Sequence, residues 1–587
     1  MKKTISAVLS FFALACAALS AQTFNPRVEV ENTYEGKVVE AGKSAIPMNV
    51  PDSLYKFQYQ LDYSVFDNPY KGSYNFQPYK IEMKPDAVPS AARRFYFNLG
   101  AGWTLHPELD LVWSPVFRTA PARLTLYDHF RGYWGPYGHM GMEGMTGGIR
   151  VLNKNVRSSQ GFVLDNKTGA NLRYEFAKVA LEVDGGFRIF ATDDTLTSHF
   201  LRAVESEVRL LPLDPNKADY FYGGRVYIHA GQDRFSSLMT GRHKLGVNDM
   251  GADLRFGAPL GARSRVLVDF GIASSVYSGA REAVVTKAWV TPHYQVRWMS
   301  GSADLGVSLS YLKGSDSTPD KRSDTFQHKS DFIYPAVKVK QYLIPDHLAV
   351  YAKAVGGDEL NSYQEYLRSN PFFNPAKLLP FMDSSSERVN ASAGFEGDIA
   401  GRLQFDVHAG YAIYHNGRCD AADFLYYQDS ANGWNTIYLT SYNNFCDYNK
   451  LYVDLSFLWK SPRLDMDGHF LYQDTDLYKN QCFAIAPSRL SGEWTATYNW
   501  NRQAFAGVSV AAASKREGYA IVGEDLDSFI RVEVPGWVDL GLTGRYVINP
   551  RWTVWAKAGN LLGQRVQRYF LHPEIGPYGT VGITFNF

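Results

Sequence analysis

The sequence predicts an all-β protein, a transmembrane antiparallel β-barrel of about 22 strands that follows a short extended N-terminal segment. Three observations predict this fold. The chain ends in an alternating strand that stops on an aromatic residue, it begins with an export signal, and long polar loops alternate with tight turns along most of its length. This combination is typical of barrels in the outer membrane of Gram-negative bacteria.

The final strand, Tyr578 to Phe587, reads YGTVGITFNF, with apolar residues at every second position from Val581 onward. Such a strand promotes aggregation in a soluble sheet. In a membrane barrel it pairs with the first strand and its apolar face meets lipid. Phe585 and Phe587 resemble the C-terminal signal that is read when outer-membrane barrels are assembled. We therefore expect the barrel assembly machinery and outer-membrane lipid as partners.

The N-terminus has the pattern of a signal peptide. Met1-Lys2-Lys3 is basic, the run Ile5–Leu19 is mostly apolar, and small residues follow it. Residues 1–21 are expected to be removed, and Cys16 is interpreted as a small apolar residue of the signal rather than as a lipidation site. The rest of the chain has no apolar run of the ~20 residues that a membrane helix needs. We therefore expect export to the outer membrane.

Composition separates two regions after the signal. Residues 22–94 are rich in Pro, Tyr, Lys and Glu and are expected to form an extended periplasmic segment, or to fold back into the barrel mouth. Residues 95–587 are expected to form the barrel. Aromatic residues make up 15% of the chain while mean hydropathy is only −0.26, which suits strands whose lipid-facing and lumen-facing residues alternate. A net charge of +1 gives no indication of nucleic-acid binding.

Clean alternation of apolar and polar residues recurs along the barrel region. It is clearest in residues 302–309, 403–413 and 450–459. Each run approaches the 9–11 residues of a tilted membrane strand. The number of strands should be even and lies between about 16 and 24.

Connections between these strands alternate in length. Tight turns are expected at Met299–Gly301, Ile344–Asp346, Ile399–Gly401, Lys460–Pro462 and Ile548–Pro550. Long polar loops are expected at Lys313–Ser330, Gly356–Ser386, His415–Asn449, Gln473–Arg489, Lys515–Pro535 and Asn560–Ile575. Short periplasmic turns with longer extracellular loops are the bacterial barrel pattern, and a sandwich or propeller would not separate them so regularly.

The last hairpin, residues 552–587, resembles the end of TonB-dependent receptors. The matching residues are Asn560, Leu561, Leu562, Gly576, Pro577, Gly582 and Phe587. Residues 370–416 are similar to receptor-like barrels of Bacteroidota, and residues 30–43 resemble members of that group that have no plug. The resemblance implies a transport-type barrel and says little about its ligand.

The chain departs from this family in its N-terminal region. Residues 22–94 are short for a receptor plug and show neither a TonB box nor a Gly-rich plug pattern. A barrel of about 22 strands encloses a lumen that must be filled. We expect the N-terminal segment, inward-folded loops or another envelope protein to fill or cap it.

Six charged residues are expected to line the lumen: Asp304, Asp406, Asp454, Asp539, Arg545 and Lys557. Charged linings can select a solute. A salt-bridged wall is the more common arrangement, and we prefer it here. Cys419 and Cys446 bracket one predicted extracellular loop and could form a disulfide in an oxidising compartment, with Cys482 as a competing partner.

Two function classes remain. The first is transport or uptake of a solute across the outer membrane. The second is a non-catalytic subunit or scaffold of an outer-membrane assembly, secretion or capture complex. We expect no enzyme, metal site or cofactor, because none of the G-x-S-x-G, H-E-x-x-H or Cys-x-x-Cys motifs is present.

Overall fold

The computed structural model describes residues 94–115, 122–143, 149–194, 197–213, 220–237, 241–261, 263–316, 331–345, 347–373, 384–429, 434–477, 483–521, 529–574 and 576–587. The expected signal peptide and nearly all of the N-terminal segment lie outside the described residues, as does Cys482.

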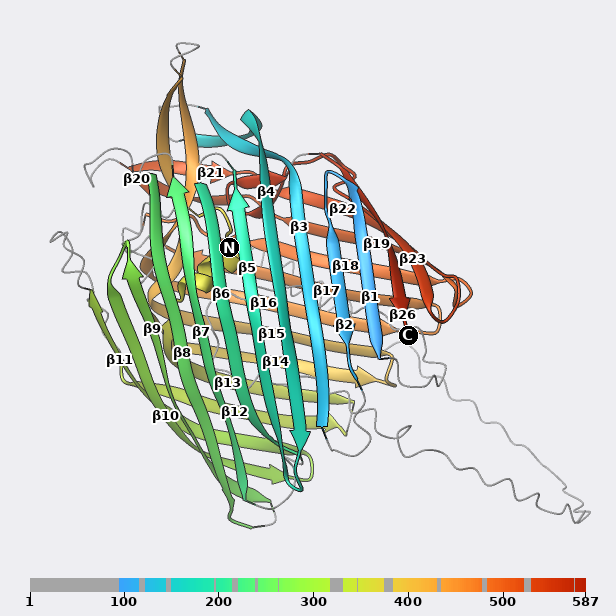
Figure 1. Ribbon diagram of the computed structural model, residues 1–587. Coiled ribbons are helices and arrows are strands. Elements are labelled where there is room, and N and C mark those ends of the chain that lie inside the picture. Colours follow the sequence, from blue (N-terminus) through green and yellow to red (C-terminus); the bar gives the residue numbers. More distant parts are fainter. Residues whose placement is uncertain are drawn as a thin grey trace, which may run out of the picture. The chain divides into compact units, whose positions relative to one another are not determined.

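The described residues form a closed antiparallel barrel of 22 strands (Figure 1). The first half of the ring consists of β1 (Phe95–Trp103), β2 (Glu108–Trp113), β3 (Ala122–Glu143), β4 (Ile149–Glu175), β5 (Val179–Asp193), β6 (Thr197–Pro212), β7 (Phe221–Ser237), β8 (Gly241–Pro259), β9 (Ser264–Gly279), β10 (Ala283–Trp298) and β11 (Gly301–Asp316). The second half consists of β12 (Ile333–Ile344), β13 (Leu348–Leu360), β14 (Ser384–Ile399), β15 (Leu403–Asp429), β16 (Trp434–Lys460), β17 (Leu464–Asp476), β18 (Leu490–Asn499), β19 (Ala504–Ala513), β22 (Trp537–Val547), β23 (Trp552–Gly559) and β26 (Tyr578–Asn586).

Four further strands lie outside the ring. β20 (Arg516–Ile521) pairs with β21 (Phe529–Val534), and β24 (Val566–Tyr569) pairs with β25 (His572–Glu574). Both are hairpins within loops, because β19 pairs directly with β22 and β23 pairs directly with β26. The predicted barrel and strand number are therefore confirmed.

The ring closes where its first and last strands meet. β1 and β26 pair antiparallel, with Phe97 opposite Phe585 and Leu99 opposite Ile583. Backbone bonds continue to the end of the chain, because the Phe587 nitrogen donates to the Phe95 carbonyl at 2.9 Å. Closure leaves no open edge in the ring, which is what a sheet needs in hydrocarbon.

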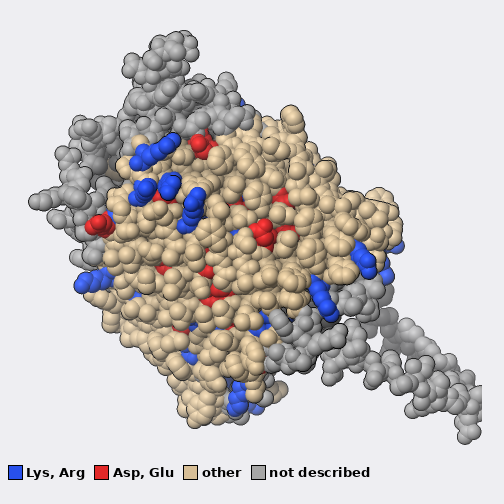
Figure 2. Space-filling view, in the orientation of Figure 1, with Lys and Arg blue, Asp and Glu red and all other residues tan. Residues whose placement is uncertain are grey.

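Alternation along the strands separates an apolar outer face from a polar inner face. On β11, Leu305 and Val307 point outward and are exposed, while Asp304 points inward and pairs with His293 of β10. Most of the outer wall in Figure 2 is uncharged, with a few Asp and Glu side chains scattered across it. The described helix, α3 (Tyr363–Ser369), is not long and apolar enough to cross a membrane, and no described helix is.

The two ends of the barrel differ as the sequence predicts. The five expected tight turns join strands at the end where β1 begins and β26 finishes. One predicted loop is wrong, because most of residues 415–449 continue the ladder of β15 and β16 as a long hairpin, with Cys419 opposite Asn444. These strands could not be recognised from the sequence, because a hairpin that extends beyond the membrane has no lipid-facing side. Its sequence therefore lacks the alternation of apolar and polar residues.

Candidate functional site in the lumen and its cap

Three of the predicted lumenal carboxylates lie on the inner wall and have basic or phenolic partners. Asp304 Oδ1 lies 2.6 Å from His293 Nδ1. Asp454 Oδ2 lies 3.0 Å from His469 Nε2, and Asp406 Oδ1 accepts a hydrogen bond from a tyrosine hydroxyl at 2.9 Å. The three side chains are 29%, 22% and 26% exposed, respectively, so water reaches the inner wall despite these pairs.

The other three predicted residues also have their own partners. Asp539 accepts from the Asn560 backbone nitrogen at 2.8 Å and forms an ion pair with Arg568 of β24. The Arg545 guanidinium lies 4.2 Å from the centre of a phenylalanine ring on β19. Lys557 Nζ donates to Glu108 at 2.9 Å. The six residues lie on five different strands and each has a partner outside this set, so they form a wall rather than one binding site.

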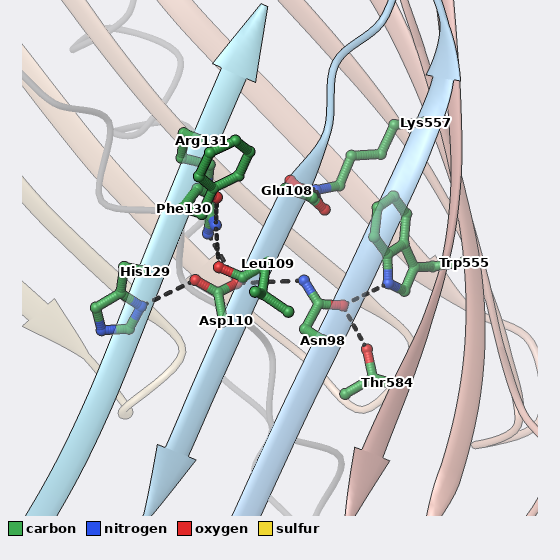
Figure 3. Close-up of polar contacts among 10 residues, drawn as sticks. All are labelled: Asn98, Glu108, Leu109, Asp110, His129, Phe130, Arg131, Trp555, Lys557 and Thr584. Carbon is green, nitrogen blue, oxygen red and sulfur yellow. Dashed lines mark hydrogen bonds and ion pairs between the residues drawn. The ribbon is translucent and has the colours of Figure 1, made fainter. Parts of the chain in front are cut away.

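A polar network crosses the barrel seam on the inner face (Figure 3). Asn98 of β1 lies at its centre, because its Oδ1 accepts from Trp555 Nε1 at 2.8 Å and from Thr584 Oγ1 at 2.9 Å. Its Nδ2 donates to Asp110 of β2 at 3.2 Å, and Asp110 also accepts from Arg131 of β3 at 2.8 Å. Side chains from five consecutive strands around the ring therefore bond across the closure.

The Lys557–Glu108 pair at this seam gives a stability prediction (Figure 3). Glu108 is largely buried, so replacing Lys557 by methionine leaves a buried carboxylate without its cation. The lysine itself is partly exposed, so we expect a loss of about 1 to 2 kcal/mol, less than for a fully buried pair. Urea unfolding in lipid vesicles, followed by tryptophan fluorescence, measures this loss. The double charge reversal E108K/K557E should recover most of it, and a single variant as stable as the native protein would contradict a stabilising pair.

The loop between β13 and β14 folds inward and caps the barrel. Its helix α3 begins after Ser362, whose hydroxyl accepts from the Glu365 backbone nitrogen and so caps the first turn. The helix and the residues after it bury their aromatic side chains, with Tyr363, Tyr366, Phe372 and Phe373 at most 1% exposed. The predicted long loop is confirmed, since β13 ends at Leu360 and β14 begins at Ser384, but its residues 363–373 fold inward instead of extending into water. A loop in water would not bury four aromatic rings, so this one packs against the barrel wall.

A buried histidine–aspartate pair holds the start of this loop. Asp233 of β7 accepts from the Tyr363 hydroxyl at 2.5 Å and from the Phe200 backbone nitrogen at 2.8 Å. It also lies 2.9 Å from His199 Nδ1 of β6, and His199 Nε2 lies 3.1 Å from the Phe373 carbonyl oxygen. Burial and the Asp233 carboxylate hold the pKa of Tyr363 well above its ordinary value, so the hydroxyl stays a donor. We call His199, Asp233 and Tyr363 the latch.

A second pair joins the cap to the β24–β25 hairpin. His572 Nε2 lies 2.9 Å from Asp194 Oδ2, and both side chains are almost completely buried. The Phe372 ring stacks on His572 with centroids 4.7 Å apart. Asp194 also accepts from the Thr197 backbone nitrogen, which fixes the connection between β5 and β6. The cap therefore contacts the wall and a neighbouring loop at the same time.

The β20–β21 hairpin packs against β15, the loop after β17 and the loop between β24 and β25. Arg516 donates to Asp420 of β15 at 2.7 Å, and its guanidinium lies 4.3 Å from the Phe570 ring centre. Ile485, from the loop after β17, bridges to Asp420 and to Gly518 of β20. Apolar residues of these segments form one buried cluster: Ala422, Ile485, Ala520, Val532, Val534, Phe570 and Leu571. Segments from four parts of the chain thus pack together at the loop end.

His106, in the loop between β1 and β2, is expected to make the stability of the loop end depend on pH. Its ring stacks on Tyr578 with centroids 4.2 Å apart and meets the edge of Tyr133. Burial lowers the pKa of His106 below its ordinary value of 6.5, so the folded protein prefers the neutral ring. Its stabilising effect is full above that ordinary pKa and is lost as pH falls through the lowered one. Between pH about 7.5 and about 5, we expect melting temperature to fall more in the native protein than in His106→Phe. An equal fall in both would contradict this.

The predicted Cys419–Cys446 disulfide is wrong. Cys419 is a free thiol, whereas Cys446 is disulfide-bonded. The two residues lie on neighbouring strands, but Cys419 is opposite Asn444 and Cys446 is opposite Gly417. Sequence spacing alone did not give this register, because a bulge separates Tyr414 from Gly417 on β15.

Among the described residues, no group of His, Cys, Asp or Glu is arranged to hold a metal ion. The arrangement consists of an aqueous, charge-lined wall beneath a cap of buried aromatic residues. Chemically, such an arrangement can admit or exclude solutes.

No protein-family model and no curated protein matches this sequence. Solved structures do match it. The copper transporter OprC has a TM-score of 0.59 and 12% identity over 86% of this chain and 81% of its own. The siderophore receptor PiuA from Acinetobacter baumannii has a TM-score of 0.59 and 10% identity over 85% of this chain and 82% of its own. FpvAI, solved with pyocin S2, has a TM-score of 0.58 and 11% identity over 85% and 71%.

The fold is that of a TonB-dependent-receptor barrel. At these identities the likeness concerns the architecture alone. The resemblance of the last hairpin to such receptors, read from Asn560 to Phe587, therefore predicted the barrel type correctly.

Inward-folded loops were one of three expected ways to fill the lumen, but sequence reasoning did not indicate which loop folds inward or which residues hold it. A signal for the cap was present, because the stretch NPFFNP at residues 370–375 places two phenylalanines between prolines inside an otherwise polar loop. The latch had no local signal, because His199, Asp233 and Tyr363 are far apart in the sequence and meet only through strand register.

Proposed function

We propose that the protein is an outer-membrane transport barrel whose own loops close its extracellular mouth. It would admit a solute into a water-filled, charge-lined lumen when the cap formed by residues 361–373 moves aside. In this proposal the chain is exported by its signal peptide and assembled by the barrel assembly machinery. It works without a standard plug, as in the receptor-like barrels of Bacteroidota that its sequence resembles.

One observation supports the proposal. The aromatic side chains of the cap are buried, whereas the charged side chains of the inner wall below it are partly exposed. The aromatic residues of the cap are almost completely buried, but wall carboxylates such as Asp304 and Asp406 keep about a quarter of their surface exposed. A barrel filled along its whole length would exclude water from those carboxylates as well. The contrast favours a gated lumen over a solid scaffold.

The scaffold alternative rests on the buried cluster formed by the loops. The apolar contacts of Ile485, Val532 and Phe570 show that loops can fill space at this end. A scaffold barrel would keep the cap permanently in place and use the loops or an additional envelope protein as docking partners. Transport and scaffold roles differ in what happens when the cap is removed.

Single-channel conductance in planar bilayers separates the two roles. The full chain is compared with a variant in which residues 363–372 are replaced by a Gly-Ser linker of equal length. We expect the native protein to be closed for most of the time and the linker variant to conduct steadily, by about tenfold or more in mean current. A linker variant that folds, judged by heat-modifiable electrophoretic mobility, and yet stays closed would overturn the transport proposal and favour the scaffold.

A further inference from the structure

The outer face of the barrel carries a basic patch near the loop end of β6, β7 and β8. It consists of Arg202, Arg234, Arg242 and Lys244, all exposed. Figure 2 shows Lys and Arg side chains gathered at the upper end of this face, above a wide band of uncharged residues. Elsewhere on the same face, charged side chains are scattered singly.

Strand alternation places these four side chains outside the barrel. On β6, Leu201 and Ala203 on either side of Arg202 are buried against the interior. On β7 and β8, the inward neighbours Asp233 and Leu245 are also buried. The patch therefore faces away from the cap and the lumen.

Register brings the patch together. Arg234 is directly opposite Phe200 on one side and Lys244 on the other. Arg242 is opposite Ser236, and the Arg202 guanidinium lies 4.6 Å from the centre of the Phe200 ring. The four cations thus occupy adjacent positions on three paired strands.

No acidic residue in the described part of the chain forms an ion pair with the patch. None of Arg202, Arg234, Arg242 and Lys244 has an ion pair with a described residue. The acidic residue at the patch edge, Asp193 of β5, is opposite Ser198 and has an interaction of its own. Four like charges held side by side repel one another unless an anion lies between them.

The patch lies where a membrane surface would be. Val204, two residues from Arg202 toward the opposite end of β6, is 55% exposed, and Ile228 and Met250 continue the apolar band on β7 and β8 at 50% and 41%. Two strand residues span about 7 Å, so the cations begin just beyond the hydrocarbon. At this level they meet lipid headgroups of the leaflet on the side of the long loops.

We propose that this patch binds the phosphate groups of a phosphorylated lipid headgroup in the outer leaflet of the outer membrane. The inference rests on the membrane placement in the proposed function but not on transport. Guanidinium groups bind phosphate through paired hydrogen bonds, and three of the four residues are arginines. Basic residues at a membrane surface each strengthen binding to anionic lipid. The apolar band below would contact the acyl chains of the same lipid.

Lipid binding to the purified full-length protein tests this proposal. Bisphosphorylated lipid A in detergent micelles is titrated, and bound lipid is counted by native mass spectrometry. The patch variant is R202Q/R234Q/R242Q/K244Q. The control R263Q/R402Q/R502Q/K460Q removes the same charge at the short-turn end. We expect the patch variant to bind lipid A at least about tenfold more weakly and the control to bind it as the native protein does.

Two further probes identify the ligand chemistry. Dephosphorylated lipid A should bind the native protein as weakly as the patch variant binds lipid A. Equal binding by patch variant and native protein, or no preference for the phosphorylated lipid, would overturn the proposal. Full competition by excess inorganic phosphate would also overturn it, since the site would then recognise free phosphate. Conductance is recorded on the same variant, so a failure of lipid binding is distinguished from a failure of transport.

Discussion

Replacing Asp233 by asparagine is expected to open the capped barrel. The Asp233 carboxylate accepts from the Tyr363 hydroxyl and the Phe200 nitrogen and lies beside His199, all without contact with water. Asparagine removes the negative charge beside His199 and leaves one oxygen acceptor where the carboxylate has two. Breaking a buried pair of this kind costs about 3 to 5 kcal/mol. We expect this loss of free energy to release the cap into water, while the hydrogen bonds between the barrel strands stay intact.

Mean current in planar bilayers measures this release. We expect the Asp233→Asn protein to conduct about tenfold more than the native protein while keeping its folded electrophoretic mobility. Asp304→Asn is the matched control, because it removes one carboxylate of an aspartate–histidine pair on the inner wall that is partly exposed and does not touch the cap. The latch has no gating role if Asp233→Asn stays closed, or if Asp304→Asn opens the barrel equally.

The barrel could be predicted from sequence because its signals are local. Leu305 and Val307 alternate with inward-facing residues, and this pattern can be recognised without knowing which strand pairs with it. The tight turns at Ser300 and Pro345 gave the direction of the strands. In a barrel strand each residue faces either lipid or water. The apolar or polar character of each residue in the sequence shows which of the two it faces.

The contacts between lumenal side chains could not be predicted from alternation, because alternation does not give the register between strands. The predicted lumenal residues Asp454 and Lys557 lie on the inner face, but their partners His469 and Glu108 follow from register. A shift of one residue between strands would move every side chain to the other face and change every pair. Cys419 illustrates the same limit, because a single bulge decides which residue it faces.

The loop that forms the cap could not be identified from the sequence for a different physical reason. Loops beyond the membrane show no fixed periodicity, so the polar composition of residues 361–373 gave no indication that this loop folds inward. Phe372 and Phe373 are nevertheless buried, one against His572 and the other against His199. Aromatic residues between prolines in a polar loop are therefore a better indicator of an inward fold than the average polarity of the loop.

Replacing the final residue, Phe587, by alanine is expected to block assembly in cells without unfolding the barrel. Its backbone nitrogen and carbonyl oxygen bond to Phe95, and its carbonyl also accepts from Arg94, so alanine preserves the closure. Phe587 is 63% exposed, and its ring packs loosely, 6.4 Å from the Phe585 ring and 5.3 Å from the Arg551 guanidinium. An aromatic ring that stabilises the folded protein so little is free to serve as the recognition element of the assembly signal.

We therefore expect Phe587→Ala to lower the amount of folded barrel in the outer-membrane fraction by about tenfold, which corresponds to a loss of about 1.4 kcal/mol in recognition. The same protein refolded in detergent should unfold at the same urea concentration as the native protein. Phe256→Ala is the control, because it removes another exposed outward ring far from the chain end. If refolding in detergent is impaired to the same extent as assembly in cells, the ring acts through stability, and the assembly-signal interpretation of Phe587 is wrong. Phe585 separates the two effects further, since its ring lies 4.5 Å from that of Trp552 and its loss should reduce both.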